Sequence, residues 1–153
     1  MAGCHQSAQL AAVKAWLIDT GPLVAYVDAA DPAHRRVVDC LDEFSGRLHT
    51  TAAVVTEAMH LVSEHSDGPE VLVDFLNTSG TDVEAMMQAA RLRAAVALMK
   101  KYRDTPMDFA DATLVLRANE LGFTEILTLD RQGFSTYRTA RGQGFRLVLA
   151  SRR

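Results

Sequence analysis

The chain has 153 residues, of which 48% are hydrophobic and 23% are charged. These values are those of an ordinary soluble globule, and the length predicts one domain with a core of its own. No apolar run approaches the roughly 20 residues of a membrane span, and a basic-then-apolar signal peptide is lacking, so we expect no membrane attachment. Cys4 and Cys40 are too few for a disulfide framework, which fits a reducing cytoplasm best.

The net charge of −3 hides an asymmetry along the chain. Residues 1–130 carry 19 acids and 10 bases, whereas residues 131–153 carry six arginines and no acid. Such an end attracts polyanions, although a merely solvated basic end explains the charge equally well. The candidates for contact with the phosphate groups of such a polyanion are Arg131, Arg138, Arg141 and Arg146.

Small polar residues over 1–12 predict a loose N-terminal extension, so we expect the domain itself to cover 13–153. The apolar run 13–18 predicts a buried strand that ends on Asp19, and a helix over 20–27 follows. Asp31-Pro32 marks the start of an amphipathic helix over 33–44. After a strand over 47–50, two further helices are expected over 52–64 and 70–76, with a loop at 77–80.

The second half begins with a long helical stretch over 82–102. A second helix follows over 105–121, in which Thr105 is expected as the cap, Pro106 as the first helical residue and Gly122 as the terminator. A strand over 125–129 then ends on Asp130, and the last strand is expected over 145–150.

Short apolar strands that alternate with helices predict an α/β fold with a parallel sheet covered on both faces. In such sheets the functional groups gather beyond the carboxyl ends of the strands. Asp19 and Asp130 each follow a strand directly, so the sequence predicts that both stand at this edge.

Three further acids stand on helices at positions that need an explanation. Asp108 and Asp111 lie one turn apart in a helix that is apolar nearly all round, and a buried carboxylate must be paired, hydrogen-bonded or bound to a metal. Glu57 shares the stripe that carries Val54 and Ala58, the apolar face of its helix. The alternative for Glu57 is an edge position from which its carboxylate reaches solvent.

Four segments together resemble a known family: LIDTGPLVAYVDAADPAH, VVTEAMHLV, PMDFADATLV and ILTLDRQGF. In this order and spacing they are similar to the PIN-domain nucleases, and in particular to the VapC-type ribonuclease toxins of toxin–antitoxin pairs. The resemblance implies a single Rossmann-like domain with a five-stranded parallel sheet. It also implies RNA as substrate, a homodimer, an antitoxin partner, and one magnesium site formed by Asp19, Glu57, Asp111 and Asp130.

The chemistry of these residues agrees with that implication. Mg²⁺ binds oxygen ligands and usually keeps several waters, so few direct carboxylates are needed, and Mn²⁺ accepts the same ligands. In phosphodiester hydrolysis a metal ion can activate the attacking water and stabilise the leaving oxygen. No arrangement of His, Cys or Ser in the sequence offers a competing nucleophile.

Each of these residues also has a purely structural explanation. Asp19 can be a helix cap, Asp130 a turn residue, and Asp108 the acid of a capping box with Thr105. Asp108 is therefore a ligand, a supporting residue or a cap. Thr20 and Thr128 are hydrogen-bonding companions of the acids, or ordinary capping and strand residues.

Two other functions stay open from the sequence. A receiver-like signalling module also carries aspartates at strand ends, but it requires a lysine after the last strand and leaves Glu57 and Asp111 unexplained. A catalytically silent binding protein on the same fold is the second alternative. A haloacid-dehalogenase phosphatase is disfavoured, because position 21, two residues after Asp19, is Gly.

Overall fold

A parallel sheet forms the centre of the computed structural model, which describes residues 13–85 and 87–149. The extension predicted over 1–12 lies outside these residues. The sheet has the order β3-β2-β1-β4-β5. Its strands are β1 (Ala15–Ile18), β2 (Arg47–Thr51), β3 (Asp82–Glu84), β4 (Glu125–Leu127) and β5 (Arg146–Leu147), and every pair is parallel. The fold class expected from the sequence, α/β with a five-stranded parallel sheet, is confirmed.

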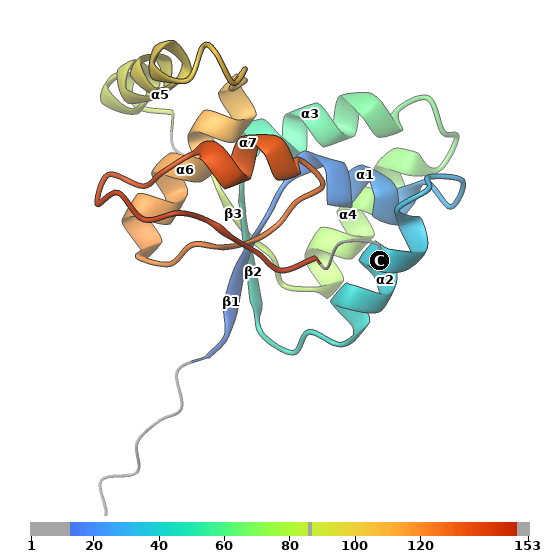
Figure 1. Cartoon of the computed structure of the whole chain (residues 1–153). Helices are drawn as coiled ribbons and strands as arrows, with labels where there is room; N and C mark the ends of the chain where they lie inside the picture. The colour runs from blue at the N-terminus through green and yellow to red at the C-terminus, as the bar shows by residue number, and fades with distance from the viewer. Residues whose placement is uncertain (1–12, 86, 150–153) are drawn as a thin grey trace, which may run out of the picture.

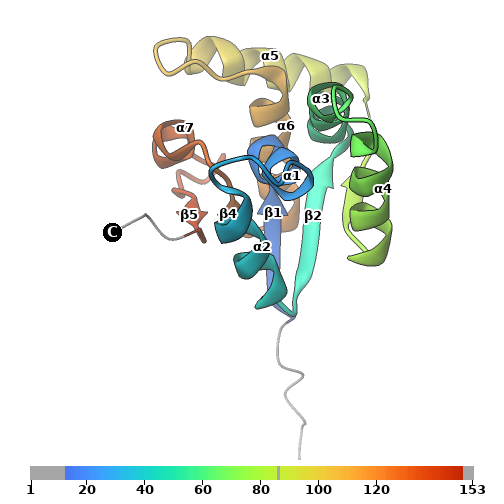
Figure 2. The same cartoon turned by 90° about the vertical axis from the view of Figure 1, so that its right-hand side faces the viewer.

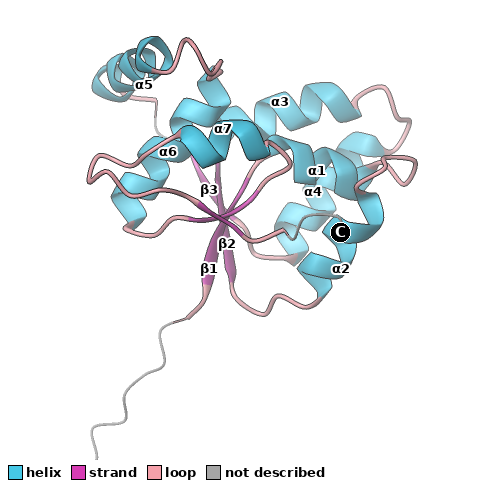
Figure 3. Ribbon diagram, viewed as in Figure 1, coloured by secondary structure: helices cyan, strands magenta, loops and turns pink. Residues whose placement is uncertain are grey.

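Helices cover both faces of this sheet (Figures 1 and 3). They are α1 (Thr20–Val27), α2 (His34–Asp42), α3 (Ala52–Val62), α4 (Gly68–Thr78), α5 (Ala89–Lys101), α6 (Phe109–Leu121) and α7 (Arg131–Thr136). In Figure 2, α1 and α2 lie in front of the sheet and α6 lies behind it. Within the described ranges, no helix is long and apolar enough to cross a membrane.

The core lies where the two central strands meet the helices. Leu17 and Ile18 of β1, Ile126 and Leu127 of β4, and Leu114 of α6 are all fully buried. Because parallel strands bury both faces, continuous apolar runs rather than alternating patterns are what this sheet requires. The register pairs Ile18 with Leu127, so the residues that follow the two strands emerge side by side at one edge.

The prediction of a single helical stretch over 82–102 is wrong. Asp82–Glu84 forms β3, which pairs with His49, Thr50 and Thr51 of β2, and α5 begins only at Ala89. The edge of β2 supplies hydrogen-bonding partners for the backbone of residues 82–84, and this tertiary pairing overrides the local helix propensity. The missed strand is also the fifth strand that the family resemblance implied.

The helix expected over 105–121 begins later than predicted. Asp108, not Thr105, is the N-cap of α6, and Asp111 occupies the third helical position of a complete capping box. The box satisfies two backbone N–H groups reciprocally, whereas Pro106 stays in the loop before the helix. The residues after Asp130 form the short helix α7, for which Asp130 is the N-cap.

Candidate active site

Asp19 lies at the carboxyl end of β1 and is held by two neighbours. Its Oδ1 accepts a hydrogen bond from the backbone N–H of Thr20 at 2.7 Å, as expected for the N-cap of α1. Its Oδ2 accepts one from the Thr128 hydroxyl, also at 2.7 Å. Only 6% of Asp19 is exposed, and its bond from the Thr20 N–H confirms the expected cap of α1. Its role as a metal ligand stays a prediction.

Glu57 joins this group through a threonine. The Thr20 hydroxyl donates to Oε2 of Glu57 at 2.6 Å, while the Thr20 backbone N–H donates to Asp19. Glu57 therefore points from α3 toward the end of β1 rather than outward along the helix. Thr20 is the residue that couples the two acids.

Asp108 and Asp111 reach the site from the start of α6. The backbone N–H of Asp111 donates to Oδ1 of Asp108 at 2.8 Å, and that of Asp108 donates to Oδ2 of Asp111 at 3.2 Å. Asp111 is 9% exposed, whereas Asp108 is an exposed residue. Asp111 thus has a structural role as the box partner of Asp108.

Asp130 follows β4 and caps α7. Its Oδ1 accepts from the backbone N–H of Gly133 at 2.9 Å, and its own N–H donates to the Thr128 hydroxyl at 3.0 Å. Thr128 therefore links Asp130 to Asp19, as Thr20 links Asp19 to Glu57. The two threonines keep three acids in one chain of hydrogen bonds.

The electrostatics indicate that the aspartates crowd one another. Burial raises the pKa of Asp19 to about 6, and the charges of Asp108 and Asp130 act in the same direction. The hydrogen bonds from Thr128 and Thr20 oppose this shift. Burial likewise raises the pKa of Asp111 to about 8, with Asp19 and Asp108 as the next contributors. Like charges that cannot escape into water favour the protonated form.

Nothing among the described residues compensates this negative charge. The salt bridges of residues 13–85 and 87–149 involve none of Asp19, Glu57, Asp108, Asp111 and Asp130. Over the same ranges, no three His, Cys, Asp or Glu side chains stand close enough to hold one metal ion directly. Carboxylate oxygens are the donors that a hard divalent cation prefers, and such a cation can keep part of its water shell where few of them bind it directly.

Comparison with known proteins identifies the fold family. The family model described as "PIN domain" matches residues 16–140. This chain belongs to the PIN domain family. Ribonuclease VapC26 of Mycobacterium tuberculosis is 35% identical to it over 133 residues, which are 86% of this chain and 98% of that protein. The predicted relationship to VapC-type proteins is thereby confirmed.

A solved structure shows the same architecture for this PIN domain. The crystal structure of Mycobacterium tuberculosis VapC20, described as a sarcin-ricin loop cleaving toxin, superposes with a TM-score of 0.68. The two chains are 16% identical, and the match covers 76% of this chain and 90% of the other. At that identity the likeness concerns the fold.

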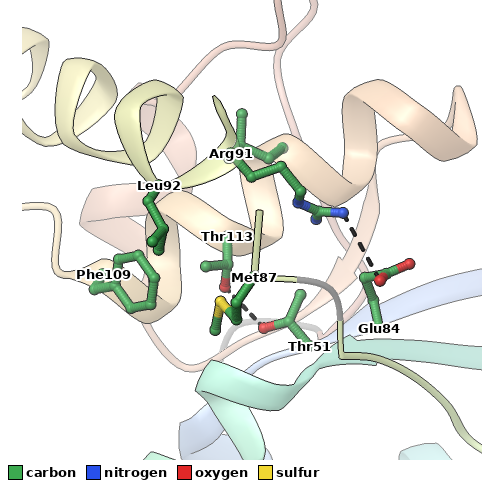
Figure 4. Close-up of a pocket in the computed structure, with 8 residues that line it drawn as sticks. Thr51, Glu84, Met87, Arg91, Leu92, Phe109 and Thr113 are labelled. Carbon is green, nitrogen blue, oxygen red and sulfur yellow. Dashed lines mark hydrogen bonds and ion pairs between the residues drawn. The ribbon is translucent and has the colours of Figure 1, made fainter. Parts of the chain in front are cut away.

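A pair of threonines behind the acids of this PIN domain was missed by sequence reasoning. The Thr51 hydroxyl, which caps α3, meets the Thr113 hydroxyl of α6 at 2.7 Å (Figure 4). This contact fixes the helix that carries Glu57 against the helix that carries Asp111. Nothing in the sequence signals it, because the two residues are 62 positions apart.

Figure 4 also shows what lies beyond this pair. A small pocket between β3, α5 and α6 is lined by Thr51, Thr113, Phe109 and Glu84, and Arg91 forms a 3.8 Å ion pair with Glu84. None of the four predicted catalytic acids lines it. A larger groove of about 430 Å³ does lie against Glu57 and Asp108. Through that groove, solvent reaches Glu57 and Asp108.

The arginines proposed as phosphate contacts have different surroundings. Arg138 donates to the carbonyls of Ser135, Thr136 and Tyr137, and it thereby satisfies the last turn of α7. Arg131 donates to the Leu149 carbonyl at 3.4 Å, and Arg146 pairs with Glu125 at 3.6 Å. Within the described ranges, Arg141 is exposed and makes no such contact. Of the four, Arg141 is the one whose guanidinium is uncommitted.

Proposed function

We propose that this PIN domain is an endoribonuclease that hydrolyses RNA phosphodiester bonds with a bound divalent cation, and that it acts in the cytoplasm as a toxin. The observation that carries the proposal is the set of crowded, uncompensated carboxylates at the carboxyl edge of the sheet. The choice of RNA is supported by the name of the relative, Ribonuclease VapC26. The fold alone would not decide between substrates.

Asp19, Glu57, Asp111 and Asp130 would hold the cation, directly or through its waters, with Mg²⁺ or Mn²⁺ as the expected ion. When bound, such an ion activates a water and neutralises charge on the phosphoryl oxygens. Without it, the like charges of the acids would repel an anionic phosphate. Asp108, which is exposed and caps α6, supports Asp111 from the rim of the groove.

The work of the chain itself is to hold these carboxylates in fixed orientations. The hydroxyls of Thr20 and Thr128 donate to Glu57 and Asp19, and the bond from Thr128 opposes the rise in the pKa of Asp19 that burial causes. Both carboxylate oxygens of Asp19 accept a hydrogen bond, one from the Thr20 backbone N–H and one from the Thr128 hydroxyl, and these two bonds fix the orientation of the carboxylate. The site is thus prepared for a cation before substrate arrives.

We further propose a homodimer and an antitoxin partner. Leu92 and Val96 lie one turn apart on α5, and they are 40% and 47% exposed. An apolar pair of this kind on a helix that projects from the body of the domain fits a protein contact (Figure 1). An antitoxin segment that enters the groove beside Glu57 and Asp108 would block access to the acids.

Incubation of the purified protein with a mixed RNA pool tests the function. We expect defined fragments with Mg²⁺ or Mn²⁺, and none from the Asp19→Asn variant. If water is the nucleophile, the 2′-hydroxyl takes no part, so cyclic 2′,3′-phosphate ends would contradict the mechanism. Binding of RNA without cleavage under any divalent cation would instead favour a catalytically silent binding protein.

A further inference from the structure

Two separate segments carry the aspartates of the site, and their relative position has to be fixed. Asp130 caps α7, which follows β4. Asp108 and Asp111 open α6, which follows the loop over 102–107. Neither helix is continuous with the other, so some contact must set the gap between the carboxylates on each side.

Tyr137 stands at the point where these segments meet. It is the C-cap of α7, and its backbone N–H donates to the Gly133 carbonyl at 2.9 Å. The side chain is fully buried. Its ring packs edge-to-face against Phe134 at 5.2 Å and against Tyr102 at 5.1 Å between centroids. The ring is therefore locked in place.

The hydroxyl of Tyr137 reaches across to the other segment. It donates to the Pro106 carbonyl at 3.1 Å, two residues before the capping residue Asp108. Within the described part of the chain, this is the hydrogen bond that joins residues 130–137 to residues 105–111. A proline has no N–H, so the carbonyl is the polar backbone group through which this position can be held.

The surroundings of Gly133 show how close the Asp130 carboxylate lies to the Tyr137 hydroxyl. A Cβ atom added at Gly133 would overlap with Oδ2 of Asp130 and would lie 2.9 Å from the hydroxyl oxygen of Tyr137. The Asp130 carboxylate and the tyrosine hydroxyl thus face the same spot over the first turn of α7. A side chain at position 133 would turn the carboxylate away from its present direction.

We propose that Tyr137 is a positioning residue of the site, which sets the distance between Asp130 and the Asp108–Asp111 pair through the Pro106 carbonyl. Gly133 completes the arrangement, because its missing side chain leaves room for the Asp130 carboxylate. This inference rests on the proposed function. Tyr137 acts through the loop and touches no reacting atom.

The variant Tyr137→Phe tests the role of the hydroxyl, because it keeps the ring contacts and removes the donor. We expect the Mg²⁺ concentration that gives half of the full thermal stabilisation to rise about 10-fold, as for other residues that orient metal ligands. Under saturating RNA, kcat should fall while KM for RNA changes little. The thermal measurement needs no substrate and reports the cation site directly.

Tyr102→Phe is the matched control. The Tyr102 ring packs against the Tyr137 ring, but its hydroxyl accepts from the backbone N–H of Arg138 at 3.0 Å and not from a residue of the 105–111 segment. We expect it to lower Tm and to leave the Mg²⁺ midpoint unchanged. Gly133→Ala places a methyl group against both the Asp130 carboxylate and the Tyr137 hydroxyl, and we expect it to raise the midpoint even though alanine favours a helix.

Equal Mg²⁺ midpoints for Tyr137→Phe and the wild type would overturn the proposal, and so would equal increases in Tyr137→Phe and Tyr102→Phe. If Tyr137→Phe fails to fold, an unchanged midpoint in Gly133→Ala overturns it. The Asp19→Asn variant separates this result from the proposed function. Unchanged cleavage and cation response in Asp19→Asn would refute the acid site itself, whereas their loss beside a normal Tyr137→Phe refutes the positioning role alone.

Discussion

Replacing Asp111 by Asn separates a functional carboxylate from a structural one. The amide oxygen of Asn can still accept from the backbone N–H of Asp108, so the capping box survives the substitution. What disappears is a carboxyl group whose burial, together with the charges of Asp19 and Asp108, disfavours its ionised form. We therefore expect Asp111→Asn to abolish RNA cleavage and, without metal, to raise the stability of the fold.

The expected gain follows from the pKa of Asp111. At pH 7 the unfolded carboxyl, with its ordinary pKa of 3.8, is ionised, whereas the folded one, with a pKa of about 8, holds a proton. Each pKa unit between 3.8 and pH 7 corresponds to about 1.4 kcal/mol, which gives about 4 kcal/mol at most. Because the charge of Asp19 supplies part of the shift, we expect a gain of about 1 to 4 kcal/mol, or several degrees in Tm.

The pH dependence of stability tests independently whether the ionised form of Asp111 destabilises the fold. A folded pKa above the unfolded pKa means that the folded state binds more protons in between, so the stability of the wild type falls as pH rises from about 4 to about 8. Asp19 adds to this loss between about 4 and about 6. Asp111→Asn should flatten the profile above pH 6, where Asp19 contributes little.

Thermal melts from pH 4 to pH 9 in EDTA, repeated with Mg²⁺, measure both effects. Asp111→Asn should melt higher in EDTA and gain less from Mg²⁺ than the wild type. Asp108→Ala, which removes the acceptor of the Asp111 N–H, should instead cost about 1 kcal/mol. Asp74→Asn on the exposed side of α4 controls for removal of a distant charge. An Asp111→Asn protein that is active and less stable would refute the reasoning.

Three further outcomes are expected. Glu57→Gln keeps an acceptor for the Thr20 hydroxyl but removes the charge, so cleavage should be lost with little change in Tm, and a fully active variant would place Glu57 outside the site. Light scattering should find a dimer that Leu92→Glu with Val96→Glu converts to a monomer, and a monomeric wild type would contradict the proposed contact. Arg141→Gln should weaken RNA binding across sequences and reduce its salt dependence, and an unchanged slope would assign Arg141 to solvation.

The sequence was most informative where local chemistry and topology agree. Asp19 and Asp130 could be placed at one edge because each follows an apolar run that only a buried strand explains, and parallel strands end together. Capping signals located most helices. They are short patterns whose physical cause lies within a few residues.

Contacts over long distances in the chain could not be predicted. The strand at Asp82–Glu84 exists because β2 offers it an edge, which no property of residues 82–84 reveals. The hydroxyl of Tyr137 donates to the Pro106 carbonyl from 31 residues away, and no local pattern announces this contact. The sequence therefore predicted the acids better than the contacts that orient them.

Cleavage in the presence of a chelator tests the central claim most directly, because it asks whether the crowded acids work through a divalent cation. The same RNA pool is incubated with wild-type protein in Mg²⁺, in excess EDTA, and in EDTA followed by an excess of Mn²⁺. We predict cleavage in the first sample, none in the second, and recovery in the third. Undiminished cleavage in excess EDTA would show that the carboxylates of this site act without a metal, and the account would be wrong.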